Sequence, residues 1–134
     1  MPDNQQTHKA LTFTEAVSKC FKNCFNFKGR ASRSEYWWFF LFIVMVNAVF
    51  EILTRIMYPS GLEYNILLVA ILIIICLFLA IAQIAVAARR LHDIGKSGWF
   101  QLLELIPVVG AIILIVLFCQ RSDLGANKYG VLED

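Results

Sequence analysis

The sequence contains little charge for its length. Only 16% of its 134 residues are Asp, Glu, Lys or Arg, whereas 59% are hydrophobic and the mean hydropathy is +0.66. Soluble domains contain about 25% charged residues, and a small one cannot cover its surface with fewer, so a soluble enzyme is disfavoured. Disorder is excluded because it requires low hydrophobicity. A net charge of +2 is too weak for a general nucleic-acid binder.

The familiar catalytic and cofactor motifs are also missing. The sequence has no nucleophile elbow, P-loop, HExxH or paired CxxC motif, and its first residues lack the apolar core and cleavage site of a signal peptide. Cys20 and Cys24 are half of a zinc-site pattern, but only His8 and His92 could add imidazoles. Burial as small hydrophobic side chains is the more common role for such cysteines. We therefore expect no catalytic residue, no cofactor and no metal site.

Three long apolar stretches are present, at residues 37–56, 66–88 and 99–119. A transmembrane helix needs about 20 apolar residues, and each stretch is long enough. In lipid, a single segment satisfies its own backbone only as a helix. The sequence thus predicts an all-α membrane protein in which residues 29–134 form one membrane domain with three transmembrane helices.

The third apolar stretch is interrupted near its middle. Pro107 lacks a backbone donor and clashes with the carbonyl of Leu103, which predicts a kink, and Gly110 follows closely. The break also allows a re-entrant segment, since halves of about eight and ten residues cannot cross a membrane alone. Glu104 and Gln83 share a depth of about 8 Å. We expect Glu104 to hydrogen-bond Gln83 or an arginine of the loop between the two stretches.

Polar residues recur on one face of the first stretch. Asn47, Glu51 and Arg55 are spaced four residues apart, so they lie on the same side of a helix. Ionisable groups inside a membrane are costly, so this face either packs on another helix or lines a hydrated path, and we favour packing. The candidate intramembrane polar contacts are Asn47, Glu51, Arg55, Gln83 and Glu104.

The chain before the first stretch predicts a polar tail at residues 1–10 and an amphipathic interfacial helix at residues 11–28. Thr12 and Glu15 match a capping box at its start. One face is apolar and aromatic and the other carries lysines, as in helices that lie in the headgroup plane or pack on their own bundle. These two placements are compatible. Ser32 and Glu35 form a second capping box before the first span.

Basic residues predict the orientation. With three spans and a cytoplasmic N-terminus, nine Lys and Arg residues lie inside and three outside, which favours a periplasmic C-terminus. A re-entrant third segment would place eleven inside and one outside, so this alternative stays open.

Four motifs follow one another along the chain. They lie at residues 27–37, 89–99, 106–110 and 125–130. Together they resemble the bacterial family called domain of unknown function 805, over roughly residues 20–130. The resemblance implies a small polytopic protein of the bacterial inner membrane and no established activity. It marks thirteen positions for testing: Gly29, Arg30, Arg33, Glu35, Trp37, Arg89, Arg90, His92, Asp93, Ser97, Trp99, Asn127 and Gly130.

Three functions are compatible with these features. We rank first a non-enzymatic membrane module that binds anionic lipid headgroups or a membrane protein, and second an oligomeric transport or channel subunit. An intramembrane enzyme that uses His92 with Asp93 or Glu104 ranks third, since neighbouring helix residues point in different directions. We expect membrane lipids as partners, with a protein partner or homo-oligomer as further options. The candidate headgroup or partner face comprises Lys28, Arg30, Arg33, Glu35, Arg89, Arg90, His92 and Asp93.

Overall fold

The computed structural model describes residues 9–59 and 65–132, and this part of the chain is helical with irregular connections. Residues 1–8 of the predicted polar tail, including the potential zinc ligand His8, lie outside the described residues. The elements in chain order are α1 (Phe13–Lys22), α2 (Arg33–Met57), α3 (Ile66–Asp93), the 3-10 helix η1 (Gly98–Leu105) and α4 (Val109–Cys119).

Both predicted N-caps begin a helix, but only Thr12 and Glu15 form the complete capping box. The Thr12 hydroxyl accepts a hydrogen bond from the Glu15 backbone amide, and the Glu15 carboxylate accepts one from the Thr12 amide at 2.8 Å. At α2, the Ser32 hydroxyl accepts from the Glu35 amide at 3.2 Å. Helix α1 ends at Lys22, before the predicted residue 28, because the Asn23 side chain donates to the Lys19 carbonyl and the chain turns there.

Helix α1 packs on its own bundle. The ring of Phe21 lies 5.7 Å from that of Phe39 and 5.6 Å from that of Phe42, both on α2. It also stacks on Phe78 of α3 at 6.2 Å. The aromatic face seen in the sequence therefore contacts two other helices, while Lys22 on the opposite face is exposed.

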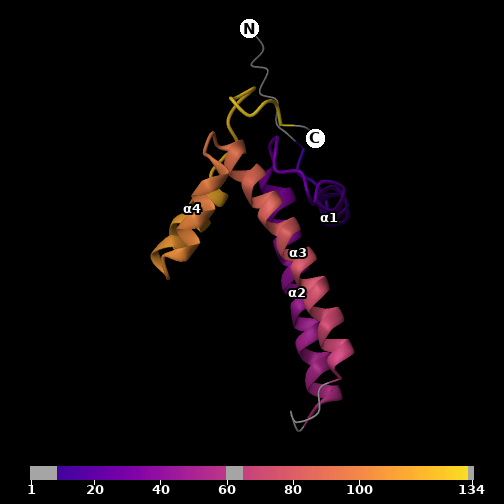
Figure 1. Cartoon of the computed structure of the whole chain (residues 1–134). Coiled ribbons are helices and arrows are strands. Elements are labelled where there is room, and N and C mark those ends of the chain that lie inside the picture. Colours follow the sequence, from indigo (N-terminus) through magenta and orange to yellow (C-terminus); the bar gives the residue numbers. More distant parts are fainter. Residues whose placement is uncertain (1–8, 60–64, 133–134) are drawn as a thin grey trace.

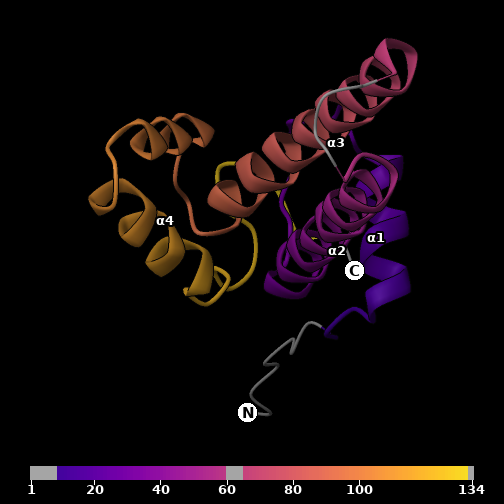
Figure 2. The ribbon, with the colours of Figure 1, turned by 90° about the horizontal axis from the view of Figure 1, so that it is seen from below.

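Helices α2 and α3 lie side by side as a long antiparallel pair, which we call the stalk (Figures 1 and 2). Their 25 and 28 residues extend about 37 and 42 Å, more than a hydrocarbon core of about 30 Å. Only 6% and 11% of the residues in their apolar windows are buried inside the molecule. By length and composition, these are the helices of the described chain that can cross a membrane.

Residues 99–119 do not form the single kinked spanning helix that the sequence predicts. The chain descends as η1, turns at Pro107 and Val108, and returns as α4, so the segment is a helical hairpin that we call the arm (Figures 1 and 2). The 11 residues of α4 extend only about 16 Å, half of a hydrocarbon core. Pro107 interrupts the helical hydrogen bonds and Val108, with φ of 64°, reverses the chain.

The tail after α4 returns to the end of the molecule where α1 lies. This end, which we call the head, comprises residues 9–33, 89–97 and 120–132 (Figure 1). The N-terminal helix and the C-terminal tail thus share one end of the stalk. This arrangement corresponds to the re-entrant alternative. It differs from the three-span prediction, which requires the two to lie at opposite ends.

Candidate functional site

A buried carboxylate, Asp93, lies at the centre of the head. It is the last residue of α3 and is fully buried. Its Oδ1 accepts a hydrogen bond from Arg30 Nε at 2.9 Å and lies 2.9 Å from Arg30 Nη2, while its Oδ2 accepts from Arg90 Nη1. Both guanidinium groups are themselves buried. Asp93 therefore joins the loop before α2 to the end of α3.

The side chain of Arg30 also binds backbone carbonyl oxygens of the C-terminal tail. Its Nη1 donates to the carbonyl of Gly125 at 2.5 Å and to that of Gly130 at 3.2 Å. Its Nη2 donates to the carbonyl of Asp123 at 2.7 Å. The tail folds back on itself through an isolated bridge between Asn127 and Gly130, which presents these carbonyls on one side. All three acceptors are main-chain atoms, so Arg30 fixes the path of the tail.

Arg90 binds the end of α4 in the same way. Its Nε donates to the carbonyl of Phe118 at 3.2 Å, and its Nη2 donates to the carbonyl of Gln120. The last carbonyls of a helix have no partner within the helix, and a cation is favourable there. Arg90 therefore serves as a cap for α4 while its Nη1 pairs with Asp93.

A second buried carboxylate, Glu35, ties α1 to the stalk. Arg89 Nη1 of α3 donates to its Oε1 at 2.6 Å, and Lys19 Nζ of α1 lies 3.7 Å from its Oε2. Glu35 is fully buried and Arg89 is 3% exposed. Arg89 Nε and Nη2 have no hydrogen-bond partner in the described chain. Three buried arginines thus share two buried carboxylates, a charge balance that makes each carboxylate indispensable.

His92 and Asp93 are neighbours in sequence but bind different groups. His92 Nδ1 lies 3.1 Å from the Gly29 carbonyl oxygen, and its ring stacks on Tyr129 at 3.9 Å. Its own carbonyl accepts from Asn127 Nδ2 at 2.9 Å. Asp93 faces the arginines instead. The geometry gives His92 a structural role under the tail and places no acid–base contact between these two side chains.

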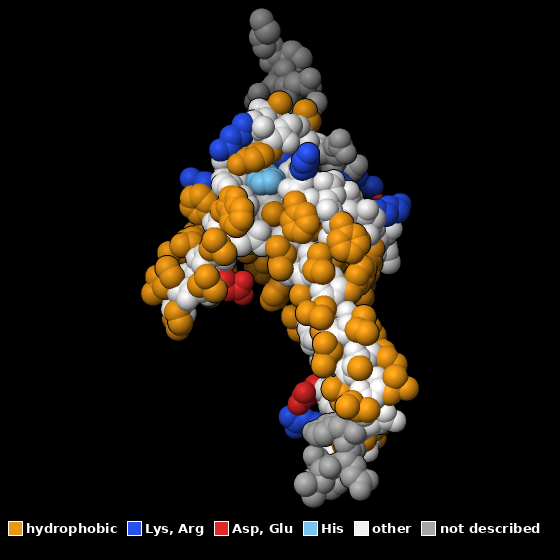
Figure 3. All heavy atoms as spheres, viewed as in Figure 1, with side chains coloured by type: hydrophobic (Ala, Val, Ile, Leu, Met, Phe, Trp, Pro, Cys, Tyr) orange, Lys and Arg blue, Asp and Glu red, His pale blue; other side chains and the backbone are white. Residues whose placement is uncertain are grey.

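Most of the predicted headgroup face lies inside the protein. Arg30, Glu35, Arg89, Arg90 and Asp93 are buried, because the arginines pair with carboxylates and backbone carbonyls of the chain itself. His92 is half-buried, and only Lys28 and Arg33 of the predicted set are exposed. Figure 3 shows the basic side chains gathered at the head, above the apolar surface of arm and stalk. The exposed cations of the head are Lys9, Lys22, Lys28, Arg33, Lys96, Arg121 and Lys128.

The predicted intramembrane polar residues do not form a common site. Glu51 pairs with Arg55 of the next turn at 2.7 Å, and both side chains are largely exposed, so this face packs on no helix of the described chain. Asn47 donates to the carbonyl of Ile43 in its own helix at 3.0 Å. Glu104 is exposed, and Gln83 Oε1 is buried with no hydrogen-bond partner among the described residues. Among the described residues, Glu104 forms neither of its two expected hydrogen bonds. It does not bond Gln83, and the arginines Arg89 and Arg90 donate to Glu35, Asp93 and the end of α4 instead.

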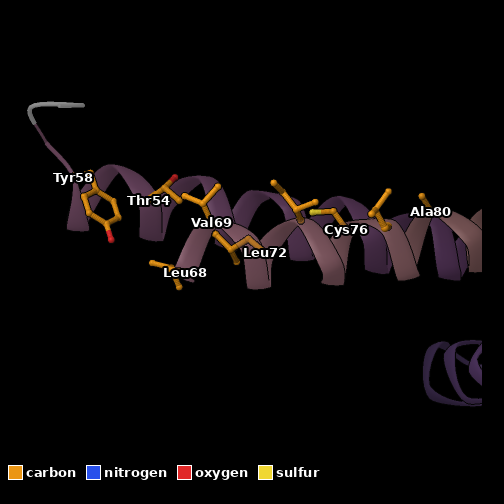
Figure 4. Close-up of a pocket in the computed structure, with 9 residues that line it drawn as sticks. Thr54, Tyr58, Leu68, Val69, Leu72, Cys76 and Ala80 are labelled. Atoms are coloured by element: carbon orange, nitrogen blue, oxygen red, sulfur yellow. The ribbon is translucent and has the colours of Figure 1, made fainter. Parts of the chain in front are cut away.

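A pocket of about 470 Å³ lies between the far ends of α2 and α3 (Figure 4). Its lining is almost wholly apolar and contains no charged side chain. It is more than two helical turns from the head and shares no residue with the buried ion pairs. The lining residues are Thr54, Tyr58, Leu68, Val69, Leu72, Ile73, Cys76, Leu77 and Ala80.

The residues that sequence reasoning missed act mainly through their backbone. Asp123 and Gly125 accept from Arg30 through carbonyls, which no side-chain pattern reveals. The family resemblance does mark Asn127 and Gly130, and it was the only available signal for the tail. In the described part of the chain, no three His, Cys, Asp or Glu side chains are grouped so as to hold a metal.

Cys20 provides a test of how α1 packs. Burial, with Glu35 nearby, raises the pKa of its thiol to about 12. At pH 8 only about one thiol in ten thousand is then ionised, and the thiolate is the reactive form. We expect iodoacetamide to alkylate Cys20 at least about 100-fold more slowly than the half-buried Cys24, as measured by mass spectrometry of peptides. Equal rates would contradict the packing of α1 against Glu35.

Comparison with known proteins gives a family and no activity. A family model described as "Protein of unknown function (DUF805)" matches residues 24–131. The chain is similar to Inner membrane protein YhaI of Escherichia coli K12, with 39% identity over 109 residues that cover 81% of this chain and 86% of that protein. It is also similar to Inner membrane protein YhaH of the same strain, with 37% identity over 112 residues that cover 84% and 90%. No solved structure gives a significant match.

Proposed function

This chain belongs to the DUF805 family of proteins of unknown function, and we propose that it is a non-enzymatic module of the bacterial inner membrane that binds anionic lipid headgroups. The names of two similar proteins support the location. The observation that carries the lipid proposal is the distribution of charge. Seven cations are exposed on the head, while Arg30, Arg89 and Arg90 are buried inside it and paired with Asp93 and Glu35.

The orientation proposed for the module follows from the same charges. Every Lys and Arg except Arg55 lies in or beside the head, which is eleven of twelve. Cytoplasmic segments carry the excess of basic residues in inner-membrane proteins. We therefore place the head in the cytoplasm, with α1 and the C-terminal tail on that side and the tip of the stalk on the other.

Three of the exposed cations lie where the membrane segments meet the head. Arg33 begins α2, Lys96 lies between α3 and η1, and Arg121 follows α4. Exposed indole rings belong to Trp38, in the second turn of α2, and to Trp99, at the start of η1, as expected for side chains at a membrane interface. A cation near an anionic membrane surface contributes about 1 kcal/mol of binding free energy. Several such cations around the entry points favour retention of anionic lipid next to the protein.

Lipid retention in nanodiscs tests the proposal. The protein is reconstituted in discs of equal phosphatidylglycerol and phosphatidylcholine, and the lipid that stays bound is counted by native mass spectrometry. A variant with Lys28, Arg33, Lys96 and Arg121 changed to Gln should lose at least about tenfold in preference for the anionic lipid, since each cation contributes about 1 kcal/mol. Arg55→Gln, at the other end of the stalk, is the matched control and should keep the preference. An unchanged preference in the fourfold variant would refute the proposed function.

A further inference from the structure

The arm is a segment that has two possible arrangements in a membrane. Residues 99–119 are 21 mostly apolar residues, long enough to cross the hydrocarbon core as one helix. In the structure they form a hairpin that enters and leaves at the head (Figure 1). Length and hydropathy therefore do not determine which arrangement the chain adopts, and another part of the molecule must favour the hairpin.

The turn of the hairpin is unfavourable by itself. Val108 adopts φ of 64° and ψ of −62°, and it is the sole non-glycine residue with positive φ among residues 9–59 and 65–132. Such a conformation is strained for any residue with a side chain, and a β-branched side chain adopts it with particular difficulty. Helix α4 also begins without a side-chain cap. The hairpin thus needs compensating contacts outside the turn.

Close packing of α4 against η1 requires a glycine at position 110. A Cβ atom added at Gly110 would lie 1.7 Å from the carbonyl oxygen of Leu103, so the return helix touches the descending one at its backbone. No residue larger than glycine fits there unless the hairpin opens. The side chains at the tip, including Leu105 and Val108, are exposed and apolar, so the turn itself finds no anchor in the rest of the protein.

The compensating contacts lie in the buried network of the head. Arg90 binds the carbonyls of Phe118 and Gln120 at the end of α4, and Asp93 holds Arg90 in place. The Asp93 carbonyl also accepts from the Asp123 amide at 3.0 Å. If residues 99–119 crossed the membrane, these acceptors would leave for the far side, and buried donors of Arg90 would lose their partners.

We propose that Arg90 is the topology-determining residue of this chain: it holds residues 98–119 as a re-entrant hairpin, and without it the segment crosses the membrane and carries the tail to the opposite side. The tail that would cross carries only the two basic residues Arg121 and Lys128. Moving two cations of a short tail across the membrane opposes crossing only weakly, whereas release of the strain at the turn favours it. This inference does not depend on lipid binding, because it concerns contacts inside the head.

Reporters fused after Asp134 test the inference. One reporter is active only in the cytoplasm and the other only in the periplasm, and their activity ratio measures the side on which the tail lies. The wild-type chain should give the cytoplasmic signal, and Arg90→Ala should shift the ratio toward the periplasm by at least tenfold. Arg33→Ala is the matched control, because it removes one cation from the same end but is exposed, and it should leave the ratio unchanged.

A steric variant separates the effect of hairpin packing from the effect of charge. Gly110→Ala keeps every charge but forces the two halves apart, so it should shift the ratio in the same direction as Arg90→Ala. Ile112→Ala, two residues further along α4 and exposed, should not. Cytoplasmic signal from both Arg90→Ala and Gly110→Ala, at wild-type amounts in the membrane fraction, would overturn the proposal. An equal shift in Arg33→Ala would do so too, because charge number alone would then account for the result.

Discussion

Asp93→Ala is expected to lower the free energy of unfolding by about 3–5 kcal/mol, the cost of leaving buried charge without its partner. The carboxylate is fully buried and pairs with both Arg30 and Arg90. Its loss leaves two buried guanidinium groups without a counter-charge and loosens the tail that Arg30 binds. The measurement is reversible unfolding of the protein in mixed micelles by a rising mole fraction of SDS, followed by tryptophan fluorescence.

The chain supplies its own control for this experiment. Glu51→Ala also removes one carboxylate that pairs with an arginine, but Glu51 and Arg55 are 62% and 79% exposed at the side chain. Exposed ion pairs contribute about 0–1 kcal/mol to stability, so this change should leave the free energy of unfolding almost unchanged. Similar losses from both variants would show that Asp93 is not the buried centre of the head.

Glu35→Leu is expected to cost about 3–5 kcal/mol for the same reason, and a second substitution should recover most of that loss. Glu35 is the carboxylate partner of Arg89, whose Nε and Nη2 have no hydrogen-bond partner in the described chain. Removing Glu35 alone leaves the Arg89 guanidinium buried and uncompensated. Replacing both by leucine removes the buried charge altogether, which is often neutral or stabilising when volumes are similar.

The comparison of the three variants gives a coupling energy. We expect Glu35→Leu and Arg89→Leu each to lower the free energy of unfolding, and the double variant to be markedly more stable than the sum of the two losses predicts. Lys19 remains partly exposed in the double variant and can turn to water. Losses that simply add would mean that Glu35 and Arg89 act separately, against the 2.6 Å contact between them.

The features that the sequence predicts well are local. The starts of α1 and α2 follow from Ser or Thr with Glu three residues later, since both partners lie within one turn. The first two apolar stretches become the stalk because a span is recognised by composition and length. Pro107 and Gly110 mark the interruption of the third stretch, but whether the chain kinks or reverses there depends on distant contacts.

The candidate site was harder to predict because its contacts join distant parts of the chain. Arg30 and Asp93 are 63 residues apart, and the carbonyls of Gly125 and Gly130 are farther still. Arginines next to a predicted span look like an interfacial basic face, whether they point outward or inward. Only the fold shows that Glu35 and Asp93 meet them in the interior. The sequence therefore singles out these arginines and carboxylates but assigns the wrong surroundings to most of them.

The long sequence separation between Arg30 and its partners in the tail affects the order in which the head forms during synthesis. The ribosome synthesises the chain from its N-terminus. Arg30 therefore emerges before the carbonyls of Asp123, Gly125 and Gly130, which lie 93, 95 and 100 residues later in the sequence. Arg30 can pair with Asp93 once α3 has been made, but its remaining donors must bind water or lipid phosphate until the tail emerges. The contacts of the head can therefore be completed only after the C-terminal tail has been synthesised. A completed head thus requires that synthesis has reached the tail.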